Sequence, residues 1–165
     1  MTAEEIIKHY SMAPLPEEGG YYVEIYRAAE SIHKTALPDR YNGNRDHCTS
    51  ILYLVTPGSF SKMHRVKSDE IFHFYLGDPV KMLMLKPGGT SEVITMSPDL
   101  KAGHLQQVIV PNGIWQGTKL IDGGKFALLG CTVSPGFEFA DYETADRDKL
   151  LQTHPTQHRM IKSLT

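Results

Sequence analysis

The chain has 165 residues, of which 41% are hydrophobic and 22% charged, and its formal net charge is -2. These values are typical of a soluble globular domain and exclude a disordered or fibrous chain, so we expect one domain over residues 1–165. The lack of a Lys/Arg cluster argues against a nucleic-acid partner. The apolar runs are too short to span a membrane and no signal peptide is evident, so we expect a cytoplasmic protein.

The first residues predict a short helix. Thr2 can cap it, and Glu5 stands at the position that completes a capping box. This helix should end before Pro14. Residues 21–28 then alternate apolar and polar side chains, which indicates a half-buried strand.

Seven short apolar runs separated by turn residues follow between residues 49 and 133. Such spacing predicts an all-β fold, an antiparallel sandwich or barrel, and excludes a parallel α/β sheet. After the last run, a short helix should begin near Asp146 and stop at Pro155, with a frayed basic end beyond it. The expected architecture is an antiparallel barrel with short helices at both ends.

The segment 58–77 carries the main candidate site. Two strand-like runs flank a polar turn near Lys67, and a tight hairpin there would place His64 directly across from Glu70. In that register Lys62 pairs with Phe72 on the same face as His64.

The same register pairs Phe60 with Phe74, so aromatic walls would surround a polar centre, as in a ligand pocket. Tyr53 either lines this pocket with its hydroxyl or packs with that group in solvent. His73 should point away from Glu70 because side chains alternate along a strand. These residues form the predicted substrate-binding wall, with His64 and Glu70 as the predicted catalytic pair.

Gly58, His64, Glu70 and Gly77 match the first sequence motif of the cupin superfamily. The second histidine of that motif is replaced here by Val66. The resemblance implies a cupin barrel, the RmlC-like jelly roll, that binds a small molecule in its interior. It also implies a homodimer that pairs barrels through outer strands.

A second cupin motif is similar to residues 111–116, where Pro111 and Gly113 match and Gln116 replaces the usual histidine. This combination resembles the uncharacterised cupin subgroup DUF985, also called Cupin_5. The resemblance covers nearly the whole chain and makes Gln116 a predicted substrate-binding residue.

The resemblance bears on metal binding because redox cupins hold iron or manganese with three imidazoles and one carboxylate. Here the ligand set would be His64, Glu70, Gln116 and water. A carboxamide oxygen is a weak ligand, so we expect any divalent metal ion to bind with low affinity. We predict no other cofactor.

Three functions remain open from the sequence. His64 and Glu70 could transfer protons without metal, as in an isomerase or epimerase acting on a carbohydrate or nucleotide sugar. The alternatives are a metal-dependent cupin oxygenase or isomerase and a non-catalytic small-molecule binding or sensing module. Replacing His64 by Ala separates an enzyme, which loses turnover, from a binder.

Three further residues have two interpretations each. Arg27 could clamp a phosphate or carboxylate, or form a surface salt bridge. Trp115 should face away from Gln116 and serve as a packing or interface residue. Cys131 lies in an apolar run and is expected to be a core thiol.

Overall fold

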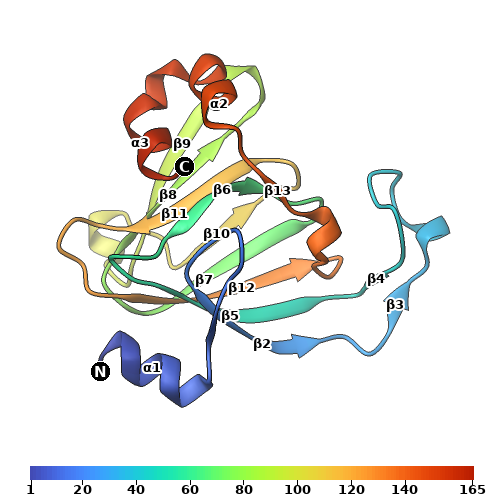
Figure 1. Cartoon of the computed structure of the whole chain (residues 1–165), viewed down its shortest axis with the longest axis horizontal. Coiled ribbons are helices and arrows are strands. Elements are labelled where there is room, and N and C mark those ends of the chain that lie inside the picture. The colour runs from blue at the N-terminus through green and yellow to red at the C-terminus, as the bar shows by residue number, and fades with distance from the viewer.

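Two antiparallel sheets that face each other form the body of the protein (Figure 1). The computed structural model describes all residues, 1–165. The strands of the first sheet, in their order across it, are β1 (Ala13–Pro14), β2 (Tyr21–Arg27), β5 (Thr49–Val55), β12 (Ala127–Ser134), β7 (Asp69–Gly77) and β10 (Gln107–Val110). Those of the second are β13 (Glu143–Thr144), β6 (Ser61–Arg65), β11 (Trp115–Leu120), β8 (Val80–Leu85) and β9 (Ser91–Met96). The predicted all-β jelly roll is confirmed.

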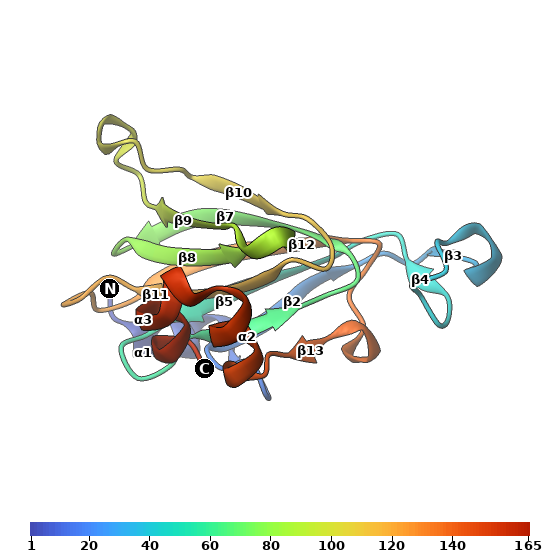
Figure 2. The same ribbon diagram turned by 90° about the horizontal axis from the view of Figure 1, so that it is seen from above.

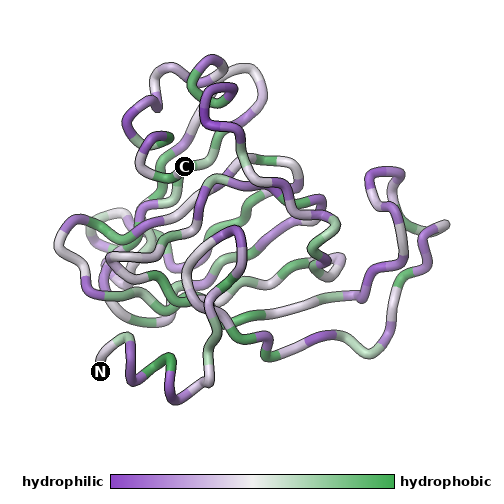
Figure 3. The backbone as a smooth tube through the Cα atoms, in the orientation of Figure 1, coloured by the Kyte–Doolittle hydropathy of each residue, from purple (hydrophilic) through white to green (hydrophobic).

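The main hydrophobic core lies between the two sheets. Tyr53 and Leu129 reach it from the first sheet, and Met82 and Met96 from the second. Alternate residues of each strand point into the barrel, which accounts for the alternation of apolar and polar positions along the strands in Figure 3. Burial of these side chains is the principal stabilisation of the barrel.

Helix α1 (Ala3–Tyr10) covers part of the outer face of the first sheet. The capping box is formed as predicted, since the side chain of Thr2 accepts from the Glu5 amide and that of Glu5 accepts from the Thr2 amide. Ile6 packs against Leu52, Leu54 and Leu128. The apolar face of this helix therefore explains the outward-facing leucines of β5 and β12.

The C-terminal segment covers the second sheet. Helix α2 (Arg147–Thr153) begins after its cap Asp146, as predicted. The predicted frayed end is wrong, because helix α3 (His158–Ser163) follows a turn at Pro155. Ile161 and Leu164 are fully buried against the outer face of the second sheet, so the tail folds there. None of the helices is long and apolar enough to cross a lipid bilayer.

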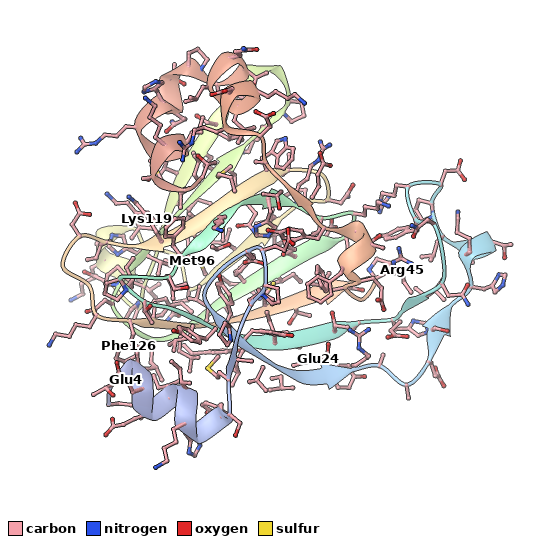
Figure 4. The ribbon with its side chains drawn as sticks, viewed as in Figure 1. Glu4, Glu24, Arg45, Met96, Lys119 and Phe126 are labelled. Carbon is pink, nitrogen blue, oxygen red and sulfur yellow. The ribbon has the colours of Figure 1, made fainter.

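A two-stranded arm leaves the barrel between β2 and β5 and projects well beyond it (Figure 2). It contains β3 (Ser31–Ile32), β4 (Arg45–Asp46) and the short 3-10 helix η1 (Lys34–Ala36). Figure 4 shows Arg45 and Glu24 on the side of the barrel from which the arm emerges. The remaining 3-10 turns are η2 (Pro87–Gly89), η3 (Leu100–Ala102), η4 (Phe139–Asp141) and η5 (Pro155–Gln157).

Candidate functional site

His64 occupies an inward position near the end of β6 and is 1% exposed. Its Nδ1 lies 2.7 Å from the backbone oxygen of Lys62. A carbonyl oxygen can only accept, so Nδ1 carries the ring proton and donates it. The other ring nitrogen, Nε2, is thereby left as an acceptor in the neutral ring.

Gln116 lies directly opposite His64 on the neighbouring strand β11. Its side-chain nitrogen is 2.8 Å from His64 Nε2 and 3.2 Å from Glu70 Oε2, so one NH2 group donates to both. Its oxygen, Oε1, is buried and has no hydrogen-bond partner. The amide thus links an imidazole to a carboxylate in a fully enclosed position.

Glu70 reaches this amide from the opposite sheet, on β7. Burial raises the pKa of its carboxyl from 4.5 to about 7, against the opposing effect of His64. The Cys131 thiol lies 3.8 Å from Glu70 Oε1, and burial raises its pKa well above the ordinary value. Near neutral pH, Glu70 therefore divides between its protonated and ionised forms, while Cys131 stays protonated.

The predicted hairpin between the strands of His64 and Glu70 is wrong. Strand β6 pairs with β11 and β13, whereas β7 pairs with β10 and β12. Residues 66–68 carry the chain from one sheet to the other, so His64 and Glu70 face each other across the barrel. They meet through Gln116 and not as a cross-strand pair.

A cavity of about 110 Å³ opens beside these residues. Of the predicted site residues, Tyr53, His64, Glu70 and Phe72 line it. The Tyr53 hydroxyl is buried and donates to the backbone oxygen of Gly19 at 2.8 Å. Gln116 is hydrogen-bonded behind this wall.

Three predicted wall residues lie elsewhere. Phe60 and Phe74 pack in the hydrophobic core and do not line the cavity. Lys62 is exposed, so its predicted place in the pocket is wrong. The pairing of β6 with β11 is irregular here: two residues separate Ser61 from His64 on β6, but only one separates their partners on β11. Ser61 and His64 are therefore both buried, and the additional residue in β6 turns Lys62 outward.

Glu18 is a site residue that the sequence did not reveal. It lies on the loop before β2, where Ser61 donates to its Oε1 at 2.7 Å. Its Oε2 is 3.8 Å from His64 Nε2. In the sequence, residues 14–20 show only the pattern of a turn, and no sequence signal predicts that Glu18 contacts β6.

Tyr142 closes the site from a second direction. Its ring stacks on His64 with centroids 5.0 Å apart, and burial raises its pKa to about 12. Phe137 and Phe139, just before it, line the cavity. We call residues 137–142 the strap, because they lie across the cavity.

The strap is held by a buried ion pair to the arm. Arg45 donates to both carboxylate oxygens of Asp141, at 2.6 and 2.5 Å, and both side chains are less than 5% exposed. A bidentate pair between a guanidinium and a carboxylate fixes the orientation of the two groups as well as their distance. The arm therefore positions the strap over the cavity.

Arg27 lies at the cavity among carboxylates. It donates to Glu24, Asp46 and Glu138, and these bonds raise its pKa. The salt-bridge interpretation of Arg27 is confirmed, because its guanidinium is committed to these partners. His73 and Trp115 lie outside the cavity, as predicted.

The donor groups present do not fit a tightly held metal ion. No group of three or more His, Cys, Asp or Glu side chains is arranged to hold one. The amide nitrogen of Gln116, which cannot act as a ligand, lies between His64 Nε2 and Glu70 Oε2. Val66 replaces a further imidazole with an apolar side chain.

Two facing antiparallel sheets around an enclosed polar site define a cupin-type barrel. Oxalate decarboxylase from Bacillus subtilis has this fold: it is 14% identical, with a TM-score of 0.55 over 94% of this chain and 38% of that chain. The chain belongs to the family described as Cupin superfamily (DUF985), whose model matches residues 4–145.

Similar proteins come from distant organisms. A hypothetical protein from Leishmania major is 30% identical, with a TM-score of 0.87 over 100% of this chain and 99% of that one. A protein from Shewanella oneidensis is also 30% identical, with a TM-score of 0.88 over 100% and 98% of the two chains. An uncharacterised protein of Saccharomyces cerevisiae is 28% identical over 147 residues, covering 84% of this chain and 69% of that protein. These relatives define the family without assigning an activity.

Proposed function

We propose that the protein binds a small polar molecule in the barrel cavity and moves a proton on it, without a metal. His64 and Glu70 are the proposed catalytic residues, and Gln116 orients both of them from behind the cavity wall. The observation that carries the proposal is the buried amide bridge from His64 Nε2 to Glu70 Oε2 beside the cavity. Tyr53 and Phe72 form the proposed wall, with Phe60 and Phe74 supporting it from the core.

The chemistry follows from the protonation states of the two groups. The neutral His64 ring has a lone pair on Nε2, and once the Gln116 amide moves off it this nitrogen can take a proton from carbon or oxygen. Glu70, with a pKa of about 7, can return one from its protonated form. One group removing a proton while the other donates one amounts to isomerisation or epimerisation, and no oxidant is needed.

The dimensions of the cavity favour a compact ligand. A cavity of about 110 Å³ is smaller than the ~150 Å³ engineered cavity that holds benzene. The enclosed part therefore suits a single small carbohydrate or similar molecule. A nucleotide sugar would have to leave most of its mass outside the barrel.

Deuterium incorporation tests the proposal. The protein is incubated in deuterated buffer with dihydroxyacetone, glyceraldehyde and hydroxyacetone, and exchange beside the carbonyl is followed by NMR. We expect exchange above the uncatalysed rate, lost in His64→Ala and reduced in Glu70→Gln. His73→Ala is the matched control, since His73 lies outside the cavity and should keep full exchange. Exchange that persists in His64→Ala would contradict the proposal.

A non-catalytic binding module is the second candidate, and one observation favours it. His64 Nε2 already accepts from Gln116, so the lone pair is free for a substrate only if the amide moves. Ligand binding that depends on His64, without exchange in any substrate, would support this function.

A metal-dependent oxygenase or isomerase would use His64, Glu70 and Gln116 as ligands and would need the Gln116 amide to turn its oxygen toward the ion. Elemental analysis after soaking with iron, manganese, nickel and zinc tests this. Near one equivalent per chain, lost in His64→Ala, would support a metal site, while substoichiometric metal would oppose it.

Homodimer formation and a cytoplasmic location remain predictions. Tyr75 and Ile109 are more than half exposed on the first sheet and could pair with a second copy. Light scattering coupled to gel filtration should give twice the chain mass of 18.5 kDa. A monomer mass would contradict the expectation.

A further inference from the structure

Carboxylates dominate the charged groups at the cavity. Four of the lining residues are glutamates, namely Glu18, Glu24, Glu70 and Glu138. Glu24 and Glu138 are paired with Arg27. Glu18 and Glu70 belong instead to the group around His64, and neither forms a salt bridge with a Lys or Arg side chain.

One oxygen of Glu18 is open to a ligand. Its Oε1 accepts from Ser61, but its Oε2 is 3.8 Å from His64 Nε2, which is beyond hydrogen-bond distance. The Tyr53 hydroxyl lies near Glu18, whose charge helps to raise its pKa, but it donates its single proton to the backbone oxygen of Gly19. The Glu18 side chain is 14% exposed, and a largely enclosed carboxylate oxygen without a donor favours one, a charged donor most of all.

No uncommitted cation of the protein reaches the cavity. Arg27 is the only Lys or Arg among the lining residues, and Glu24, Asp46, Glu138 and the backbone oxygen of Phe137 accept from its guanidinium. Lys62 is turned to solvent. A phosphate or carboxylate ligand would therefore meet carboxylates without a balancing positive charge.

The rest of the wall suits a cation as well. Five lining residues are aromatic: Tyr22, Tyr53, Phe72, Phe137 and Phe139. Aromatic faces attract organic cations, more strongly where water is excluded. The combination of aromatic wall and carboxylate is the arrangement that recognises ammonium groups.

We propose that the ligand of this cavity is a compact organic cation, a protonated amine, whose N–H groups donate to Glu18 Oε2 while its carbon atoms lie against the aromatic wall. This inference rests on the binding half of the proposed function and does not require proton transfer. It assigns Glu18 as the residue that selects ligand charge.

Matched probes of equal shape and different charge test it. Propylamine, 1-propanol and propionate form one series, and butylamine, 1-butanol and butyrate a second. Calorimetric titration of the full chain at pH 8 should show the amine of at least one series binding about tenfold more tightly than its alcohol and acid. Glu18→Gln should weaken amine binding about tenfold and leave alcohol binding unchanged.

Glu17→Gln is the matched control, because Glu17 lies on the same loop and is exposed. It should leave amine affinity unchanged. The inference is overturned if an alcohol or acid binds as tightly as its amine, if amine affinity survives Glu18→Gln, or if none of the six probes binds. An alcohol that binds more tightly than its amine, with affinity lost in His64→Ala, would keep the small-molecule site and reject only its charge preference.

Discussion

Gln116 and His64 are directly opposed on β11 and β6, and the side-chain amide of Gln116 joins His64 Nε2 to Glu70 Oε2 of the opposite sheet. A single NH2 group thus connects the two sheets at the cavity. Gln116 stands where cupins have a metal-binding histidine, but its amide is a hydrogen-bond donor that lies between His64 and Glu70, the other two candidate ligands. Proton-transfer or binding chemistry accords better with this geometry than metal chemistry does.

Glu70→Gln should change how stability depends on pH. Burial raises the pKa of Glu70 from 4.5 to about 7, so between these values the folded chain holds a proton that the unfolded chain has released. The stabilisation by this proton is fully present below pH 4.5 and is lost as pH rises through about 7. The free energy of unfolding of Glu70→Gln, relative to that of the wild type, should therefore rise by on the order of 3 kcal/mol from pH 5 to pH 8, as measured by urea unfolding.

Asp69→Asn is the control for this experiment. Hydrogen bonds from Asn112 lower the pKa of Asp69, so this carboxyl is ionised at both pH values. Asp69→Asn should change the free energy of unfolding by the same amount at pH 5 and pH 8. A Glu70→Gln variant with an equally flat difference would show that Glu70 titrates as an ordinary carboxyl.

The buried pair of Arg45 and Asp141 should be sensitive to removal of one partner. Asp141→Asn leaves a buried guanidinium without its counter-charge, which typically costs roughly 3–5 kcal/mol. Chemical denaturation should report this loss, and amides of residues 137–142 should exchange faster. Glu143→Gln, which breaks an exposed pair with Arg65, should cost less than about 1 kcal/mol. Equal effects of the two variants would contradict the role of Arg45 in holding the strap.

Gly20→Ala should destabilise the fold next to the cavity. Gly20 has φ +72°, and a Cβ atom there would lie 2.5 Å from the Tyr53 hydroxyl oxygen and 2.6 Å from Tyr53 Cζ. Since Tyr53 is buried, it cannot move aside freely, and we expect a loss of about 2 kcal/mol or more. Gly58→Ala, where nothing lies within 4 Å, should be neutral by the same thermal unfolding assay. An unchanged unfolding temperature for Gly20→Ala would contradict the expected clash with Tyr53.

Tyr142 should shield His64 through its ring and not through its hydroxyl. The hydroxyl is buried and Thr144 beside it falls short of hydrogen-bond geometry, so Tyr142→Phe should leave stability within ~0.5 kcal/mol or raise it. Tyr142→Ala removes the stacked ring and should expose His64. Mass spectrometry after brief diethylpyrocarbonate treatment should then find His64 modified faster in Tyr142→Ala only. Slow modification in both variants would refute the shielding role.

Local signals predicted much of the fold. The capping box of Thr2 and Glu5 and the cap at Asp146 act within one helical turn, so sequence spacing reveals them. The strands of the barrel follow from alternation and turn residues, which also act locally. The inward positions of His64 and Glu70 were predicted by alternation, although the pairing assumed for their strands was wrong.

Contacts between distant segments were decided by tertiary structure alone. The assumption of a hairpin at Lys67 failed because three residues are enough to carry the chain to the opposite sheet, and local pattern does not separate a turn from a crossing. The tail folded as α3 because Ile161 and Leu164 find an uncovered sheet face, which residue order does not disclose.

By itself the sequence determined an antiparallel sandwich or barrel, because strand periodicity and turn chemistry depend on neighbours along the chain. Its resemblance to the cupin motifs placed Gln116 with His64 and Glu70 inside a barrel. Only the tertiary structure brought Glu18 and Tyr142 to His64 and set the amide of Gln116 between His64 and Glu70. These contacts depend on which strands pair and on how loops cross the barrel, and long-range packing decides both.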